Sequence, residues 1–135
     1  MTNTRIYIAA RFGRRQEAER LANYLRFHGF TVVSRWHSEE AVRTWGTNDA
    51  DPEISIRCLS DIRRCDAFVA LSEAPDCAVA GAARGGRHCE FGIALALGKR
   101  LFVVGTAENA FHRHGLVTVV ASEGELFREL KKLTA

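Results

Sequence analysis

Several signals that would assign this chain of 135 residues to a common class are missing. No apolar run approaches the length of a membrane span, and the N-terminus lacks the charged-then-apolar pattern of a secretory signal. The four cysteines form no C-x-x-C pair, so we expect reduced thiols and a cytoplasmic protein. With only two prolines and 47% hydrophobic residues, the composition predicts one compact domain over residues 1–135 and no membrane partner.

The common cofactor signatures are missing too. No G-x-G-x-x-G follows the first expected strand, and no G-x-x-x-x-G-K-[ST] occurs, so dinucleotide and P-loop cradles are not expected. His88, Cys89 and Glu90 match the first half of a zinc deaminase signature. The second half needs two more cysteines, and none follows Cys89. The sequence therefore predicts no metal site of this kind.

The chain also lacks a large excess of charge of one sign. The formal net charge of +3 is too small to predict binding to polymeric nucleic acid. The arginines are nevertheless clustered, with Arg11, Arg14 and Arg15 after the first expected strand and Arg84 and Arg87 around a glycine pair. If both loops lie at the same end of a sheet, these side chains form a positive pocket for a phosphate or another small anion.

Apolar runs alternate with amphipathic segments along the chain. Strands are expected at residues 5–10, 30–34, 66–72, 101–105 and 117–120. Helices are expected at residues 14–28, from Asp51-Pro52 to Cys65, in the segment that contains Glu90, and at residues 123–133. This alternation predicts an α/β fold, a flavodoxin-like doubly wound sheet of about five parallel strands flanked by helices. Residues 36–50 read as a long irregular segment that covers the active site.

The segment GGRHCEFG at residues 85–92 is the most informative part of the chain. It places Glu90 just inside a helix, after the glycine pair Gly85 and Gly86. The backbone N–H groups and the helix dipole at this position are expected to favour the ionised carboxylate, which is the form that acts as a nucleophile. In a doubly wound sheet, loops 10–14, 73–87 and 106–114 converge beyond the carboxyl ends of the strands. Glu90 and the arginines are therefore expected to share a cleft.

The chain resembles the nucleoside 2-deoxyribosyltransferase superfamily, and most closely its short phage-type and bacterial members, which are related to nucleoside 5′-monophosphate N-glycosidases. The segments that carry the resemblance are IYIAARF at 6–12, SRW at 34–36, DI at 61–62, CDA at 65–67, GGRHCEFG at 85–92 with ALALGK at 94–99, and ENAFH at 108–112. They occur in order over nearly the whole chain, which makes the resemblance more specific than any single motif.

The resemblance implies cleavage or transfer of the N-glycosidic bond of a nucleoside or nucleotide. Glu90 matches the nucleophile that attacks the anomeric carbon, and Tyr7 matches an aromatic residue that orients it. The expected substrate-binding residues are Arg11, Arg14, Asp61, Gly85, Gly86, Arg87, Asn109 and His112. No cofactor is expected, because the carboxylate supplies the covalent chemistry. The resemblance also implies a homodimer or larger homo-oligomer, with residues 108–114 contributing to the interface.

Two positions depart from the pattern. Cys58 stands where members commonly carry an aspartate that binds the sugar, and Asp61, three residues later on the same helix, either partly replaces it or pairs locally. Arg84 stands where the transferases place the acid that protonates the departing base, so Glu73 and Asp76 are the only loop acids that could reach. The arginines favour a substrate with a 5′-phosphate, in which case water completes the reaction. Hydrolase and transferase remain open, as do the base and the sugar.

Two other classes of function remain open. Cys58 is compatible with a non-catalytic module that binds or senses nucleotides and keeps only the fold. A partner-docking module would need an exposed apolar patch, and the sequence offers no clear one. A second polar residue aimed at Glu90, such as Tyr7, would favour the enzyme, whereas an exposed and unpaired Glu90 would favour the sensor.

Overall fold

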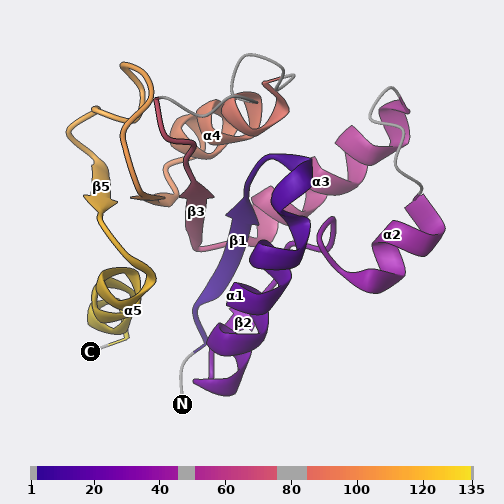
Figure 1. The fold of residues 1–135 in the computed structure, drawn as a ribbon, viewed down its shortest axis with the longest axis horizontal. Helices are drawn as coiled ribbons and strands as arrows, with labels where there is room; N and C mark the ends of the chain where they lie inside the picture. Colours follow the sequence, from indigo (N-terminus) through magenta and orange to yellow (C-terminus); the bar gives the residue numbers. More distant parts are fainter. Residues whose placement is uncertain (1–2, 46–50, 76–84, 135) are drawn as a thin grey trace.

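The computed structural model describes residues 3–45, 51–75 and 85–134. Its centre is a parallel sheet of five strands in the order β2-β1-β3-β4-β5 (Figure 1). The strands are β1 (Arg5–Ala9), β2 (Thr31–Val32), β3 (Ala67–Leu71), β4 (Arg100–Val104) and β5 (Val117–Val120). This order reverses direction between β1 and β3, which confirms the predicted flavodoxin-like α/β fold and places its switch point there.

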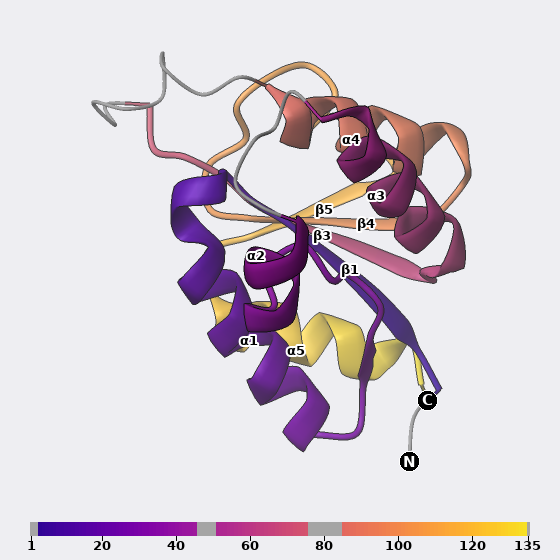
Figure 2. The same cartoon turned by 90° about the vertical axis from the view of Figure 1, so that its right-hand side faces the viewer.

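Helices cover both faces of the sheet (Figure 2). They are the short 3₁₀ turn η1 (Phe12–Arg14) and the helices α1 (Arg15–Phe27), α2 (Glu39–Trp45), α3 (Pro52–Arg64), α4 (Gly86–Ala96) and α5 (Glu123–Lys132). Figure 2 shows α3 and α4 on one side of the sheet and α1 and α5 on the other. None of the helices in the described ranges is long and apolar enough to cross a membrane.

The alternating side chains of β1 build one apolar core on each face. Ile6 and Ile8 pack toward α1 and α5, whereas Tyr7 and Ala9 pack toward α3 and α4. Every residue of β3 is buried, as expected for a central strand with helices on both faces. Each fully buried large apolar side chain contributes about 1.5–3 kcal/mol to folding. Tyr7 is therefore held by a well-packed core on the face that carries α4.

Local signals explain where the helices begin and end. The Asp51 side chain accepts the Glu53 N–H at 3.0 Å, and Pro52 fills the first helical position of α3, as the sequence predicted. After α4 the chain turns at Gly98, whose φ of 74° favours glycine. These boundaries place the N-termini of α3 and α4 at the carboxyl-terminal edge of the sheet, where ligands bind in such folds.

The prediction of an irregular segment at residues 36–50 was wrong for the part that the structure describes. Helix α2 occupies Glu39–Trp45, and residues 46–50 lie outside the described ranges. The Ser38 hydroxyl accepts the Ala41 N–H at 3.0 Å, and Glu39 and Glu40 provide acids for the first turn. A serine followed by two glutamates is a helix start, and this signal was missed.

Candidate active site

Glu90 lies in the second turn of α4, which follows β3 at the switch point of the sheet. The helix begins after Gly85, whose φ of 81° places the residue in the left-handed region that glycine tolerates best. The Tyr7 hydroxyl, from β1, donates a hydrogen bond to Glu90 Oε2. Strand β1 and helix α4 thus bring together two residues that are 83 positions apart in the sequence. This is the pairing that the sequence analysis set as the mark of a catalytic Glu90.

The Glu90 carboxyl group is more often protonated than the sequence predicted. Burial of the carboxyl raises the pKa of Glu90 to about 7, although the hydrogen bond from Tyr7 lowers it. The expectation that the helix N-terminus would keep this carboxylate ionised is therefore corrected, because desolvation outweighs it. A carboxyl group with this pKa changes its protonation state near neutral pH.

The Tyr7 side chain is held in place as a hydrogen-bond donor. Its side chain is fully buried, and its ring stacks on Phe68 with the ring centroids 5.2 Å apart. Burial and the nearby Glu90 charge raise the pKa of Tyr7 well above 10, so the hydroxyl keeps its proton. A tyrosine that cannot ionise donates to Glu90 at every pH at which the carboxylate could act.

Cys58, on α3, interacts with both members of this pair. Its thiol lies beside both side chains, and its interaction with Glu90 lowers the pKa of the carboxyl. Burial raises the pKa of Cys58 to about 12, so the group is a neutral thiol and a weak donor. The substitution noted in the sequence therefore lies in direct contact with the proposed nucleophile.

Asp61 pairs locally, which was one of the two roles expected for it. The residue is fully buried, and its carboxylate accepts the Arg35 backbone N–H at 3.1 Å and the Arg35 Nε–H at 3.0 Å. Arg64 adds a further contact of 3.0 Å to Oδ1. In the unliganded protein the Asp61 carboxylate thus holds two arginines, and its binding of substrate stays a prediction.

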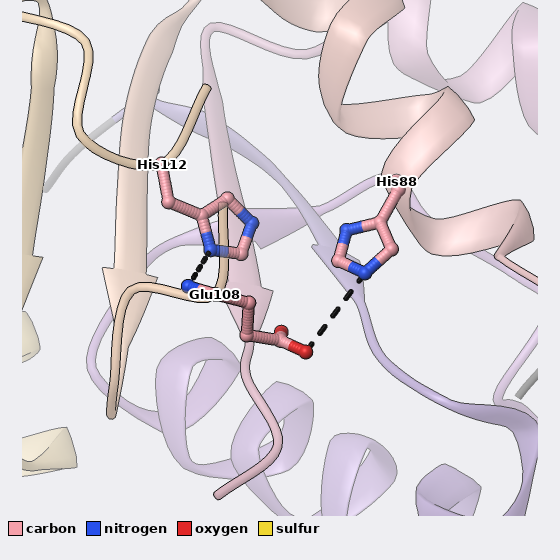
Figure 3. A group of neighbouring side chains, drawn as sticks. All are labelled: His88, Glu108 and His112. Atoms are coloured by element: carbon pink, nitrogen blue, oxygen red, sulfur yellow. Dashed lines mark hydrogen bonds and ion pairs between the residues drawn. The ribbon is translucent and has the colours of Figure 1, made fainter. Parts of the chain in front are cut away.

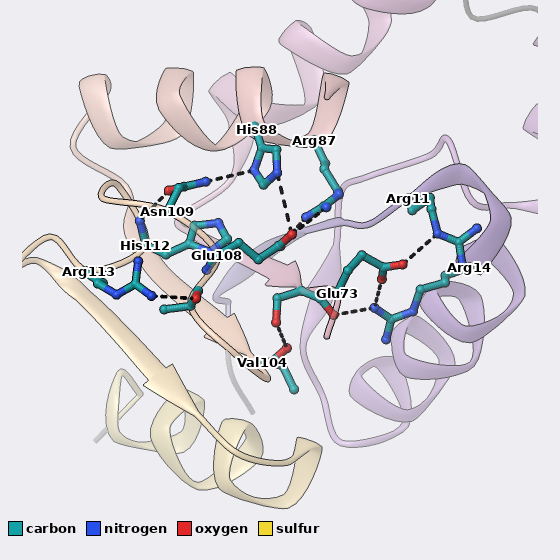
Figure 4. A network of polar contacts seen from close by, with 12 residues as sticks. Arg11, Arg14, Glu73, Arg87, His88, Val104, Glu108, Asn109, His112 and Arg113 are labelled. Carbon is teal, nitrogen blue, oxygen red and sulfur yellow. Dashed lines mark hydrogen bonds and ion pairs between the residues drawn. The ribbon is translucent and has the colours of Figure 1, made fainter. Parts of the chain in front are cut away.

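Arg11 and Arg14 converge on the buried Glu73, which follows β3 (Figure 4). Arg11 Nε lies 2.8 Å from Glu73 Oε1, and Arg14 NH1 lies 2.7 Å from Oε2. Burial acts to raise the pKa of Glu73, but the two arginines outweigh it and the pKa falls below its usual value. A lowered pKa favours the ionised form of Glu73, so the arginine pairing argues against this residue as the acid that protonates a departing base, and that role stays a prediction.

Arg87 forms a second pair, with Glu108 in the loop after β4. Both guanidinium NH groups bind the carboxylate, and Arg87 NH2 lies 2.8 Å from Glu108 Oε1. The backbone N–H of Glu73 also contacts Glu108, so the loops after β3 and β4 meet at this carboxylate. Arg87 Nε is buried and has no hydrogen-bond partner among the residues that the structure describes. A buried N–H donor of this kind costs about 1–3 kcal/mol unless an acceptor reaches it.

His88, Glu108 and His112 form the group in the described residues that most resembles a metal site (Figure 3). Their potential ligand atoms lie within 4.8 Å of one another. However, His112 Nδ1 accepts the Glu108 N–H at 3.0 Å, and His88 Nδ1 accepts from the Asn109 amide at 3.3 Å. Both rings therefore carry their proton on Nε2, and Arg87 holds the Glu108 carboxylate. These contacts favour a hydrogen-bond network, and the absence of a metal stays a prediction.

The loop after β4 is ordered by its own polar contacts. The Asn109 Oδ1 atom accepts the His112 N–H at 3.0 Å, and the His112 ring packs on Phe91 with the centroids 4.7 Å apart. His112 is buried, and burial lowers its pKa, so the ring is neutral. Asn109 and His112 thus support the segment that carries Glu108, and their predicted contact with substrate stays a prediction.

The structure separates the predicted residues into two groups. Tyr7, Cys58 and Glu90 lie close together, whereas Arg11, Arg14 and Arg87 each hold a carboxylate. Gly85 and Gly86 lie at the start of α4, and a Cβ added to either would meet nothing within 4 Å among the described residues. Arg84 and Asp76 lie outside the described residues. Sequence analysis missed that Glu73 and Glu108 neutralise the arginines, and the only available signal was the excess of arginine in these loops.

Comparisons with known proteins agree with the fold. No curated protein sequence matches the chain. A solved structure described as the CMP N-glycosidase BcmB of Clostridium botulinum superposes with a TM-score of 0.56 at 23% sequence identity, and the match covers 95% of this chain and 98% of that one. A family model described as nucleoside 2-deoxyribosyltransferase matches residues 6–128. The chain therefore belongs to the nucleoside 2-deoxyribosyltransferase family.

Proposed function

We propose that the protein cleaves or transfers the N-glycosidic bond of a (deoxy)nucleoside or nucleoside 5′-monophosphate through a covalent intermediate on Glu90. The observation that supports this most directly is the hydrogen bond from Tyr7 to Glu90. It fixes a partly buried carboxyl group with a pKa of about 7 at the switch point of the sheet. Family membership supports the same reaction class.

In the first step, a Glu90 oxygen attacks the anomeric carbon, and the bond from that carbon to the base nitrogen breaks. The bonding electron pair leaves with the base, and the sugar becomes a glycosyl ester of Glu90. Tyr7 binds Oε2, so we assign the attack to Oε1. The transition state resembles an oxocarbenium ion, which an ionised carboxylate stabilises directly.

In the second step, water or a free base attacks the anomeric carbon and releases the Glu90 carboxylate. Water gives the free sugar and a free base gives a new nucleoside, and in each case the attacking group releases its proton to solvent. The base that left in the first step takes up a proton from solvent. Protonation of the departing base is not assigned to Glu73 or Glu108, because the neighbouring arginines lower the pKa of each carboxyl. Both outcomes of the second step remain within the proposal.

A 5′-monophosphate is the form of substrate that the arginine-rich side of the site favours. Arg87 Nε is a buried donor without an acceptor, and it lies near the start of α4, where a helix N-terminus attracts anions. No described atom lies within 4 Å of a Cβ added to Gly86, which is compatible with a ligand at this position. The matched solved structure, described as a CMP N-glycosidase, agrees with a phosphorylated substrate.

A nucleotide-sensing module is the second candidate function, and Cys58 is the observation that favours it. A neutral thiol binds a sugar hydroxyl more weakly than a carboxylate does. Against this candidate, Tyr7 donates a hydrogen bond to Glu90, and folding alone does not require this contact. Oligomeric state stays a separate proposal, a homodimer or larger, which light scattering on the purified protein tests.

The test is a panel of ribo- and deoxynucleosides and their 5′-monophosphates, each with and without a free acceptor base. Chromatography detects released base and exchanged nucleoside, and mass spectrometry of the denatured protein detects a sugar on Glu90. Glu90→Ala is the active-site variant, and Glu123→Ala, at an exposed residue at the start of α5, is the control. Turnover that survives in Glu90→Ala contradicts the proposal. Binding without turnover across the panel favours the sensing module.

A further inference from the structure

Side chains replace the missing end of β2 beside β1. The backbone ladder between these strands ends when the Val33 N–H donates to the Ile6 carbonyl at 2.8 Å. Beyond this point Ile8 is fully buried, and its N–H donates to Ser34 Oγ at 3.0 Å. The Trp36 Nε1–H donates to the Ile8 carbonyl at 2.7 Å. Both backbone groups of the residue that follows Tyr7 are therefore satisfied by the turn at residues 34–37.

A buried relay holds this turn. Ser34 Oγ lies 2.7 Å from His37 Nε2, and His37 Nδ1 lies 2.7 Å from Glu19 Oε1 on α1. The Glu19 carboxylate can only accept, so His37 carries a proton on Nδ1 and donates it to Glu19. In a neutral ring Nε2 then accepts from the Ser34 hydroxyl, whose oxygen accepts the Ile8 N–H. The relay runs in one direction from β1 through Ser34 and His37 to α1.

The relay has the residue types of a hydrolytic triad, but it cannot act as one. Ser34 and His37 are each only 1% exposed, so no substrate can reach the hydroxyl. The serine oxygen is also occupied by the Ile8 N–H. Ser34, His37 and Glu19 therefore serve to fix the turn between β1 and α1, rather than to attack a substrate.

The same turn is tied to α3. The Arg35 N–H donates to the buried Asp61 carboxylate at 3.1 Å, between the residues that bind Ile8. Strand β1 carries Tyr7 and helix α3 carries Cys58, and both residues contact Glu90. The turn thus joins β1 and α3, and the distance between these two elements determines how Tyr7 and Cys58 lie around Glu90.

We propose that His37 is a positioning residue for the reaction, which acts through the turn at residues 34–37 to set the placement of Tyr7 and Cys58 on Glu90. This inference rests on the proposed function, because it assigns Glu90 as the reacting group. His37 touches no part of the proposed substrate site. Its effect is transmitted through Ser34 to β1 and through the Arg35 backbone to α3.

Charges around His37 are consistent with a neutral ring. Burial lowers the pKa of His37, although the Glu19 carboxylate acts to raise it. Arg26 lowers the pKa further, and the Asp61 carboxylate acts in the opposite direction. Since the ring is neutral in the assembled relay, a neutral side chain with one donor and one acceptor is the conservative replacement.

The test compares His37→Gln, which keeps one donor and one acceptor, with His37→Leu, which keeps neither. Carbon-13 NMR of glutamate-labelled protein follows the titration of Glu90, whose signal is assigned by its loss in Glu90→Gln. In His37→Leu the Tyr7 donor is displaced, so we expect the Glu90 midpoint to rise by at least about 0.5 pH unit. We expect kcat to fall at least about tenfold while KM changes less than about twofold, and His37→Gln to restore both readouts.

A folded His37→Leu protein with an unchanged Glu90 titration overturns the proposal. Where His37→Leu fails to fold, Ser34→Ala breaks the same relay with a smaller change in volume, and the same two outcomes apply. The NMR titration needs no turnover, so it separates this inference from the proposed function. If the Glu90 midpoint shifts but the protein is inactive on the whole panel, the effect of the relay on Glu90 is supported and the proposed reaction is contradicted.

Discussion

Glu73 is buried and Glu90 is partly buried, both at the carboxyl-terminal edge of one sheet, and their environments have opposite effects on the pKa of the carboxyl group. Glu73 meets Arg11 and Arg14, and its pKa falls below the usual value despite burial. Glu90 meets Tyr7 and Cys58, which are neutral, and its pKa rises to about 7. Among the described residues, no cation pairs with Glu90. The same side chain is thus an anchor for arginines in one place and a titrating group in the other.

The contrast shows how a small fold separates structure from chemistry. A carboxylate paired with arginines is stable as an anion and holds loops together, but it is a poor nucleophile because its charge is already compensated. A carboxylate with only neutral donors keeps its reactivity, and its desolvation costs stability. Variants that exchange or remove these partners should therefore affect the two glutamates differently.

The largest effect is expected at Glu90. Glu90→Gln should lower turnover by about 10³-fold or more, because the amide cannot form the ester. The same variant should be more stable than the wild type at pH 8, by roughly 3 kcal/mol, since the folded-state pKa of about 7 exceeds the ordinary value of 4.5.

The sign follows from proton binding. Between these two pKa values the folded protein holds a proton that the unfolded chain has lost, so wild-type stability falls as the pH rises from 4.5 through 7. Thermal unfolding of both proteins from pH 4 to pH 8 measures the difference. Equal pH dependence in the two proteins would show that Glu90 is not desolvated.

Substitution of Arg87 should lower the stability of the protein, in contrast to Glu90→Gln. Arg87→Gln leaves the Glu108 carboxylate buried without its partner, which should cost about 3 kcal/mol in the free energy of unfolding. The double variant Arg87→Gln/Glu108→Gln should recover most of this loss. If Arg87 also binds phosphate, the double variant keeps a raised KM for monophosphates and an unchanged KM for nucleosides. Recovery of both stability and monophosphate KM would limit Arg87 to a structural role.

Tyr7→Phe should produce an intermediate effect. The variant removes a hydrogen bond that lowers the pKa of Glu90, so the acid limb of the kcat/KM profile should move to higher pH. At pH 7 the expected loss is about 10- to 100-fold, the range for a hydrogen bond to a charged group. Tyr24→Phe, at a half-exposed tyrosine on α1, is the control. A profile that falls in height without moving along the pH axis would argue against Tyr7 as the tuning donor.

The smallest effect is expected at Gly86. A methyl group there meets no atom within 4 Å, so Gly86→Ala should keep or slightly raise stability, by less than about 1 kcal/mol. In the liganded protein the methyl occupies space at the start of α4, and KM should rise a few-fold. Gly92→Ala, in the interior of the same helix and equally free of contacts, is the matched control. Equal KM values in the two variants would place the ligand elsewhere.

Much of the fold was predictable because it depends on local patterns. The near-continuous apolar run of β3 and the Asp51-Pro52 start of α3 are each readable from a few neighbouring residues. Strand β2 was predicted too long, because Val33 continues the apolar pattern whereas the backbone ladder ends with the Val33 N–H. Beyond Val33, side chains take the place of backbone groups as partners of β1, and no local sequence pattern predicts this replacement.

The site was predictable in its residues but not in its charge states. The position of Glu90 follows from the glycine pair and the helix that begins there, and its pairing with Tyr7 follows from the family resemblance. Its raised pKa depends on how deeply α4 packs on the sheet, and the lowered pKa of Glu73 depends on side chains from another loop. Desolvation and ion pairing are tertiary properties, so neither can be estimated from local sequence patterns.

The short β2 has a consequence for solubility as well. A sheet edge with free N–H and C=O groups recruits strands from other molecules, and many proteins aggregate by this route. Here the edge strand is two residues long, and the backbone of Ile8 beyond it is already occupied by Ser34 and Trp36. This side of the sheet therefore offers very little backbone to which a foreign strand could add.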